Sequence, residues 1–521
     1  MPIPVNPDEQ LIVARLVEFL TPSTSWNRSL WSPGTILQLK ELLEAVDASR
    51  QGILRSKPLE RLGSSCLRVI GLDCGLTSAE KSILNHAIKG IKPDNLDFHL
   101  IAQLVPSLEE NYLLKWGEAI GGPSPPQPER TARSLSSHLL DLGYSGDFLR
   151  KWWIGKTHGS GPEPTVRELC EAAHGELCGR VLRAFEVAIA FVNSPKSASG
   201  FPPGWLPAND LTKWLTENNF HVSEVRISGG FILQVNALDS ESATTLAADR
   251  IAQLVARSSV ATSDTLRPWR QVWIKGETNP HSIARAPRGV RVKALYREDQ
   301  IFTPSDGIVD AAVDLLAELE NSSPTSAVAS GWAAIEALLA ETDDRATAAD
   351  RLAAIIACSF PRAELTVLSY AGKRSFSRSL LDELDRCDEN RDRAAIIARE
   401  VASGSDLHLQ RQTDRAALRR IQRILESPNK RLNDIATHVG DALHRLYRQR
   451  NLILHGGKTN SVALRAGLRT TAKLVGAGMD RIVHGSYVKN LRPIELAARA
   501  RIAIDTASES NPVSCADLLG I

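Results

Sequence analysis

Six residues near the end of the chain, Arg450 to His455, combine side chains that could cut a phosphodiester. They read Arg-Asn-Leu-Ile-Leu-His and are followed by two glycines. Arginine is always charged and forks onto phosphate oxygens, whereas histidine can accept and donate protons near neutral pH. RNA carries its own nucleophile in the 2′-OH. A protein that only moves protons and stabilises charge on the phosphate could therefore cleave RNA without a metal.

The spacing of Arg450 and His455 constrains how they could share one site. Residues i and i+5 lie about 140° apart around a regular helix and about 7.5 Å apart along it. A long arginine can still reach the histidine if the helix ends there, and Gly456-Gly457 is a helix stop signal. A second copy of the motif from a partner chain would complete such a pocket more easily. The alternative is that Arg450 is a surface charge and His455 a helix-end residue.

Positive charge is concentrated around this motif. The whole chain has 62 Lys and Arg and 60 Asp and Glu; segment 409–490 holds 16 of the first and five of the second, which leaves 46 against 55 elsewhere. Such a segment predicts contact with a polyanion, or else a solvated helix face that pairs with the acidic remainder. The residues that we expect to contact RNA are Arg415, Arg419, Arg423, Arg445, Arg448 and Lys458.

The motif and two earlier segments resemble the HEPN (higher eukaryotes and prokaryotes nucleotide-binding) superfamily, most closely the ApeA-like HEPN proteins of prokaryotic anti-phage defence. The two segments are residues 330–339 and 349–353, and the resemblance covers roughly the last 215 residues. It implies a metal-independent ribonuclease site at a dimer interface. Carried over by position, Arg450 and His455 are catalytic, Asn451 assists, and Glu336 stands where an acid orients the arginine.

Composition limits the class of protein. With 521 residues, 43% hydrophobic and 23% charged, the chain is long enough for two to four soluble domains. No signal peptide or membrane span is evident, so we expect a cytoplasmic protein that does not bind a membrane. The seven cysteines are scattered and expected to be reduced. Cys170, His174 and Cys178 span ~12 Å of helix, too far for one zinc ion, and no cofactor or metal is expected.

The order of predicted elements gives a mainly α, multi-domain fold. Residues 1–195 are expected to form a helical N-terminal region, with helices at 9–20, 36–48, 78–90, 97–119, 131–151 and 165–193. Residues 205–300 predict a small α+β domain, with strands at 221–227, 231–237 and 271–275 and helices at 209–217 and 242–257. Residues 305–521 predict the HEPN-like helical domain.

The helix that carries the motif is predicted at 431–454, with a cap at Asn433-Asp434. Its apolar stripe is expected to be Ile435, Val439, Leu443, Leu446 and Leu454, which leaves His444, Arg448 and Asn451 nearer the rim. His484 stands in a similar sequence with the wrong spacing and is expected to be structural or to lie beside a phosphate.

Together these patterns favour an endoribonuclease effector, a toxin-like enzyme of antiviral defence. Its expected partners are RNA, a second copy of the chain in a homodimer or higher even oligomer, and a regulatory protein or phage trigger that lifts inhibition. A non-catalytic HEPN module for dimerisation, partner or RNA binding explains the same basic segment. A DNA-binding regulator would also use that charge, although no recognition-helix signature is present.

Overall fold

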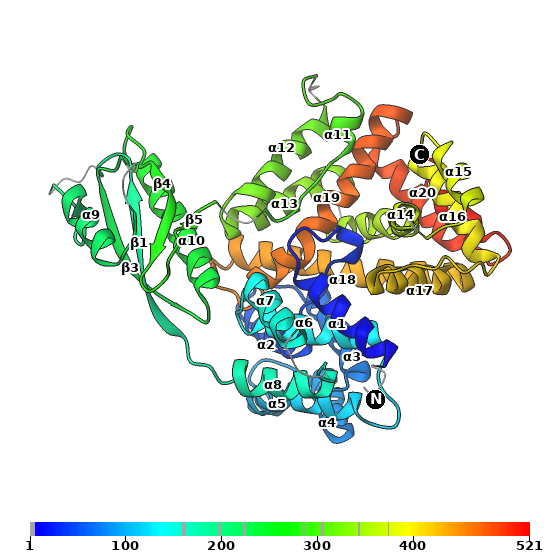
Figure 1. Cartoon of the computed structure of the whole chain (residues 1–521), viewed down its shortest axis with the longest axis horizontal. Helices are drawn as coiled ribbons and strands as arrows, with labels where there is room; N and C mark the ends of the chain where they lie inside the picture. Colours follow the sequence, from blue (N-terminus) through cyan, green and yellow to red (C-terminus); the bar gives the residue numbers. More distant parts are fainter. Residues whose placement is uncertain are drawn as a thin grey trace. The chain divides into compact units, whose positions relative to one another are not determined.

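The fold is mainly helical with one small antiparallel sheet, as the sequence predicts (Figure 1). The computed structural model describes residues 6–158, 163–195, 200–221, 226–284, 287–303, 307–341, 344–372 and 375–521. The chain forms two compact units. Unit 1 comprises Met1–Asp141, Lys156–His174 and Arg288–Ile521, and unit 2 comprises Leu142–Gly155 and Gly175–Pro287.

Unit 1 contains almost all of the helices. Its N-terminal part holds α1 (Pro7–Leu20), the short 3-10 helix η1 (Trp26–Arg28), α2 (Thr35–Arg50), α3 (Ser56–Leu72), α4 (Ser78–Gly90), α5 (Leu96–Ile120), α6 (Pro128–Asp141) and most of α8 (Val166–Leu177). Its C-terminal part holds α11 (Ala294–Arg297), α12 (Ile308–Asn321), α13 (Pro324–Leu339), α14 (Thr347–Ala371), α15 (Arg378–Asp385), α16 (Asn390–Ala402), α17 (Gln412–Glu426), α18 (Pro428–Leu454), α19 (Leu464–Lys489), α20 (Pro493–Thr506) and η2 (Pro512–Asp517).

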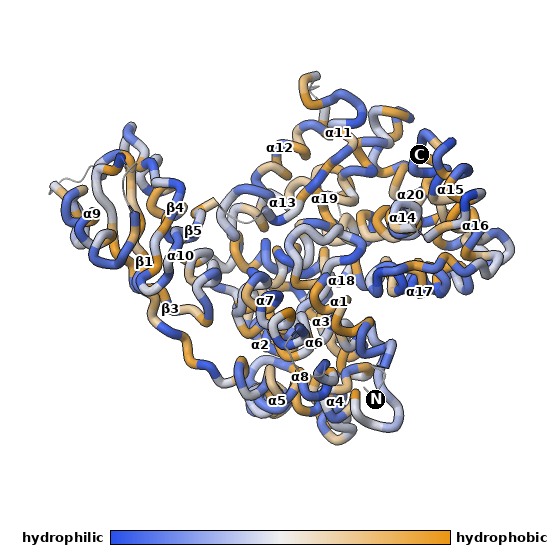
Figure 2. The backbone as a smooth tube through the Cα atoms, viewed as in Figure 1, coloured by the Kyte–Doolittle hydropathy of each residue, from blue (hydrophilic) through white to orange (hydrophobic). Residues whose placement is uncertain are grey.

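The centre of unit 1 is α14, which is buried along most of its length and packs against α13, α16, α17, α18, α19 and α20. Figure 2 shows hydrophilic and hydrophobic residues alternating along α17, as expected of a helix with one buried face. Among the described residues, α14 alone is long and apolar enough to cross a membrane, and 78% of its most apolar window is buried inside the protein. Those properties also suit a core helix.

Arginine–carboxylate pairs join the N-terminal helices to the C-terminal ones. Arg15 of α1 lies 2.8 Å from Glu129 of α6, which also contacts Arg420 of α17 at 3.1 Å. Arg420 in turn lies 2.6 Å from Glu364 of α14, a carboxylate with no exposed surface. Arg28 of η1 reaches Glu364 at 3.1 Å. Residues 1–141 and 288–521 are therefore parts of one unit, unlike the separate domains expected at 1–195 and 305–521.

Unit 2 is built around a sheet with strand order β2-β3-β1-β4-β5. The strands are β1 (Arg183–Phe191), β2 (Leu206–Pro207), β3 (Gly229–Ala237), β4 (Pro268–Ile274) and β5 (His281–Ser282), accompanied by α7 (Gly146–Thr157), α9 (Ala208–Glu217) and α10 (Ser240–Ala261). Ile189 and Phe191 of β1 pack in the core that contains Ala247 of α10, and the alternate residue Ala190 packs with α9. Both faces of the sheet are thus covered by a helix.

Several predicted elements differ from the observed ones. The predicted helix 165–193 is wrong beyond Leu177, because residues 183–191 form β1. Since β1 is buried on both faces, it lacks the alternation of apolar and polar residues by which a half-exposed strand is recognised. The predicted helix 131–151 is two helices, α6 and α7, while α3 and α20 were not predicted. The predicted strand 221–227 lies mainly outside the described residues.

Candidate ribonuclease site

The motif residues lie at the C-terminal end of α18. Arg450 and Asn451 belong to its last turns, and His455 is the residue that caps it, with its backbone N–H donating to the Asn451 carbonyl at 3.0 Å. The helix begins at Pro428, directly after Ser427, so the predicted cap at Asn433-Asp434 is wrong: both residues lie inside the helix. Proline is well suited to a first helical position because its missing N–H would have no partner there.

Two glycines set the path of the chain after His455. Gly457 has φ +62°, a left-handed conformation, and the N–H of Lys458 donates to the Leu452 carbonyl at 3.0 Å. The N–H of Gly457 donates to the Ile453 carbonyl at 3.1 Å, which is the left-handed capping motif that ends many helices, as the predicted stop signal requires. Gly456 approaches Ile53 so closely that an added Cβ would lie 2.7 Å from the Ile53 Cδ1 atom. The chain turn beside His455 therefore depends on both glycines.

Arg450, Asn451 and His455 are connected by hydrogen bonds within a single chain. Arg450 Nη1 donates to Asn451 Oδ1 and to His455 Nε2, both at 3.0 Å. Because a guanidinium can only donate, Nε2 of His455 is the acceptor, and a neutral His455 carries its proton on Nδ1. Asn451 is buried, Arg450 is half-buried and His455 is exposed. The two motif side chains therefore meet despite their i+5 spacing, without a second chain.

Glu336 contacts other groups. Its Oε2 accepts from the Trp332 indole N–H at 2.7 Å, and its Oε1 lies 2.7 Å from Arg345. Trp332 packs against Tyr447 of α18 with the ring centroids 4.7 Å apart. No hydrogen bond or ion pair between Glu336 and Arg450 occurs in the part of the chain that the structure describes. Glu336 is thus linked to α18 through Trp332, whose indole N–H donates to its carboxylate.

Two arginines predicted to bind RNA are instead buried ion-pair partners. Arg445 and Arg448 are 1% and 3% exposed, and they contact the carboxylate of Glu41 in α2 at 2.8 and 2.7 Å. Although burial alone would raise the pKa of the Glu41 carboxyl, the two guanidinium groups hold that pKa below its ordinary value. Because Arg445 and Arg448 lie inside the protein and are neutralised there, their assignment as RNA contacts is corrected.

The apolar stripe of α18 also differs at its edges. Val439, Leu443 and Leu446 are buried as predicted, but Leu454 is 54% exposed. The predicted rim residues His444, Arg448 and Asn451 are all buried. His444 Nε2 lies 3.2 Å from Asp350, and burial lowers the pKa of the histidine. Arg448 and His444 are buried beside carboxylates from α2 and α14, and Asn451 accepts from Arg450. Periodicity on α18 alone does not show these pairings.

The remaining predicted RNA contacts are on the surface. Arg415, Arg419 and Arg423 are exposed on one face of α17, while Lys458 is half-buried in the turn after the motif. Arg419 lies 3.0 Å from Asp8, and Arg423 donates to the Gln127 side chain at 3.3 Å. Some of the basic segment therefore pairs with the acidic N-terminal helices, which is the alternative stated for it above.

Glu41 and Glu44 of α2 were missed by the sequence analysis. Glu44 accepts a 2.6 Å hydrogen bond from Ser461, which ties the loop after the motif to α2; burial raises the pKa of the Glu44 carboxyl. Both glutamates lie some 400 positions before their partners. The acidic balance of the chain outside 409–490 was the one available signal, and it does not identify individual residues.

Two further groups were considered in the sequence: His484, expected to be structural or to lie beside a phosphate, and Cys170, His174 and Cys178, for which no metal was expected. Nδ1 of His484 donates to Glu298 Oε1 at 2.9 Å, and burial lowers the pKa of the histidine. Within the described residues, no group of three or more His, Cys, Asp or Glu could hold a metal ion. Cys170 is buried, and burial raises the pKa of its thiol to about 12.

Comparisons with family models, with curated proteins and with solved structures find no match to this chain.

Proposed function

We propose that this protein is a metal-independent endoribonuclease whose site is formed by Arg450, Asn451 and His455. The observation that carries the proposal is the pair of 3.0 Å hydrogen bonds from Arg450 Nη1. They hold a phosphate-binding cation beside an exposed proton carrier. The resemblance to HEPN proteins supports the same reading and adds prokaryotic antiviral defence as the setting.

The arrangement suggests an order of events. In the free protein the Nε2 lone pair of His455 is occupied by Arg450. A scissile phosphate would draw the guanidinium into a two-pronged contact, which would release Nε2. The imidazole could then take the proton of the 2′-OH as that oxygen attacks the phosphorus in line. The P–O5′ bond would break, the 5′-oxygen would take a proton from water, and His455 would return the 2′-OH proton to the solvent. The other product would end in a 2′,3′-cyclic phosphate.

Asn451 would keep Arg450 on the correct side of the helix end. Its Oδ1 accepts from the same Nη1 that reaches His455, so it limits the rotation of the arginine. A homodimer, with two motifs facing one RNA, belongs to this proposal through the resemblance and the general prevalence of twofold assemblies. A dimer is not required to bring Arg450 to His455.

The test is cleavage of a labelled RNA by the purified full chain in the presence of EDTA. His455→Ala and Arg450→Ala should each lower the rate by roughly 10²-fold or more, the usual contribution of acid–base catalysis. His408→Ala and Arg378→Ala are matched controls because both side chains are exposed and outside the motif; they should keep wild-type rates. Product ends should react as cyclic phosphates.

Two results would reject the enzyme. Cleavage that persists in His455→Ala would show that another group or a contaminant is responsible. If the wild-type chain binds RNA but never cleaves it, while His455→Ala binds equally well, the non-catalytic HEPN module is the better description.

A further inference from the structure

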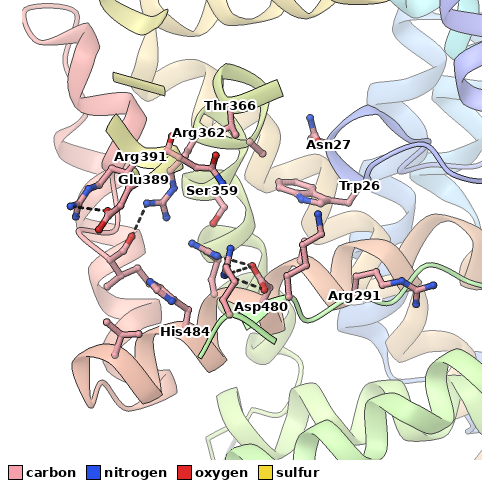
Figure 3. A pocket seen from close by; sticks show the side chains of 18 of the residues that line it. Trp26, Asn27, Arg291, Ser359, Arg362, Thr366, Glu389, Arg391, Asp480 and His484 are labelled. Carbon is pink, nitrogen blue, oxygen red and sulfur yellow. Dashed lines mark hydrogen bonds and ion pairs between the residues drawn. The ribbon is translucent and has the colours of Figure 1, made fainter. Parts of the chain in front are cut away.

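A second candidate site lies in unit 1 and contains none of the three motif residues. It is a cavity of about 700 Å³, within the ~300–1,000 Å³ typical of small-molecule sites. Its walls come from η1, the segment before and including α11, the middle of α14, the start of α16 and the C-terminal half of α19. Figure 3 shows Arg362 and Arg391 on one side of it and Trp26 on the other.

The lining of this cavity carries an excess of positive charge. Seven Lys or Arg line it against four Asp or Glu, and these residues are Arg291, Lys293, Arg297, Arg362, Arg391, Arg481 and Lys489, and Glu298, Asp388, Glu389 and Asp480. This ratio contrasts with the near balance of the whole chain. A concave surface lined by one sign of charge concentrates ligands of the opposite sign.

The acidic residues of the wall are largely paired already. Asp480 lies 2.7 Å from Arg481, and Glu389 lies 3.1 Å from Arg391 (Figure 3). Glu298 is bonded to His484. Lys293 and Lys489 are exposed at the cavity and have no carboxylate partner in the part of the chain that the structure describes. Their ammonium groups are therefore available to a ligand.

Arg362 is a largely buried cation in the wall of this cavity, with other guanidinium groups close to it. Its side chain is 13% exposed; Nη1 donates to the Ile521 carbonyl at 2.6 Å and lies 3.2 Å from Asp517. Burial, together with the nearby Arg481 and Arg391, lowers the pKa of Arg362 to about 10 even though Asp517 opposes this. A bound anion would relieve both the desolvation and the repulsion between the guanidinium groups.

The opposite wall offers a group suited to an uncharged, flat ligand part. The half-buried Trp26 contributes an indole ring to this wall. Proteins commonly hold nucleobases by stacking them on aromatic rings. The side-chain Nδ2 of Asn27 has no hydrogen-bond partner, but it is fully buried and does not open into the cavity.

We propose that this cavity binds a nucleotide with at least two phosphate groups, its phosphates contacted by Lys293, Arg362 and Lys489 and its base by Trp26. The site is separate from Arg450 and His455 and does not depend on the ribonuclease proposal.

Isothermal titration of the full chain with ADP, inorganic pyrophosphate and adenosine tests this. ADP should bind more tightly than adenosine because the charge excess acts on the phosphates. The double variant Lys293→Glu/Lys489→Glu should lower affinity for both ADP and pyrophosphate roughly tenfold or more. Lys89→Glu/Arg378→Glu, with two exposed charges outside the cavity, should bind as the wild type does. Trp26→Ala should weaken ADP and leave pyrophosphate unchanged.

Three outcomes would overturn the proposal. The first is absence of saturable binding of ADP and pyrophosphate at millimolar concentration. The second is a loss of ADP affinity in Lys89→Glu/Arg378→Glu as large as that in Lys293→Glu/Lys489→Glu, which would indicate non-specific attraction. The third is loss of RNA binding in Lys293→Glu/Lys489→Glu when neither small ligand binds, because the cavity would then belong to an RNA-backbone surface. Unequal responses to ADP and pyrophosphate in Trp26→Ala would support a base contact.

Discussion

At the scale of residues, Arg450 reaches His455 through the length of its own side chain. His455 keeps helical backbone angles and the N–H bond to Asn451, so the two side chains start from different faces of α18, and the guanidinium spans the distance to Nε2. The same helix contributes Arg445 and Arg448 to the interior, where Glu41 neutralises them. Neighbouring arginines of α18 thus have different roles. Arg445 and Arg448 form buried ion pairs, whereas Arg450 lies at the candidate site on the surface.

Glu41 should be essential for stability because it is the carboxylate shared by those two supports. Glu41→Gln leaves two buried guanidinium groups uncompensated, and we expect a loss of about 3–5 kcal/mol in the free energy of unfolding at pH 7. Since the pKa of Glu41 is lowered in the folded state, its stabilisation is complete above the ordinary value of 4.5 and is lost as pH falls through the folded value.

Urea unfolding at a series of pH values checks this. The difference between wild type and Glu41→Gln should be largest near pH 7 and should shrink below about pH 4.5. Glu60→Gln, at an exposed position of α3, is the matched control and should cost little at any pH. If the difference in the free energy of unfolding between wild type and Glu41→Gln stays constant from neutral to acidic pH, an ionic role for Glu41 is contradicted.

At the scale of elements, the left-handed Gly457 determines where α18 stops and hence where His455 lies. An alanine in that conformation costs about 1–2 kcal/mol, while asparagine tolerates it better. Gly457→Ala should therefore lower both stability and RNA cleavage, and Gly457→Asn should retain most of each. Thermal unfolding and the cleavage assay measure the two effects. Equal behaviour of both variants would show that the backbone conformation at Gly457 is unimportant.

The elements also show what sequence reasoning can reach. The C-terminal helices were predictable because their apolar residues recur at helical spacing and Pro or Gly marks their ends, as Pro428 and Gly457 do for α18. Strand β1 was not, because its two buried faces remove the alternation on which strand prediction relies. At the candidate site, the contact between Arg450 and His455 was only one of two possibilities, since a pocket shared by two chains was expected to form more easily. The burial of Arg445 was not foreseeable, because its partner Glu41 is distant in sequence.

At the scale of the whole molecule, the basic character of 409–490 divides into an internal and an external part. Buried carboxylates neutralise three of its arginines, Arg420, Arg445 and Arg448. Three others face solvent along α17: Arg415, Arg419 and Arg423. Only the external part can release counterions when RNA binds. The electrostatic contribution to RNA affinity should therefore come from a few residues, fewer than the net charge of the segment suggests.

Replacement of Arg415, Arg419 and Arg423 together by alanine should flatten the dependence of log affinity on log salt by roughly 2–3 units. The measurement is RNA binding by fluorescence anisotropy across a range of salt concentrations, with catalytically disabled His455→Ala as the background. Arg55, Lys89 and Arg378, exposed elsewhere in unit 1, supply the control triple. An unchanged slope would assign the α17 arginines to pairing with Asp8 and Gln127 rather than to RNA.

The pairing of α2 with α18 has a consequence for how the protein is made. Glu41 leaves the ribosome some 400 residues before Arg445 and Arg448, and at about 5–20 residues per second that interval lasts roughly 20–80 s. During it α2 has no partner for its buried carboxylate, and unit 1 cannot close. When α18 emerges, Glu41 of α2 is already present to pair with its arginines. The candidate catalytic turn can therefore form only as synthesis nears completion. Nascent chains stalled before residue 445 should be protease-sensitive throughout residues 6–141.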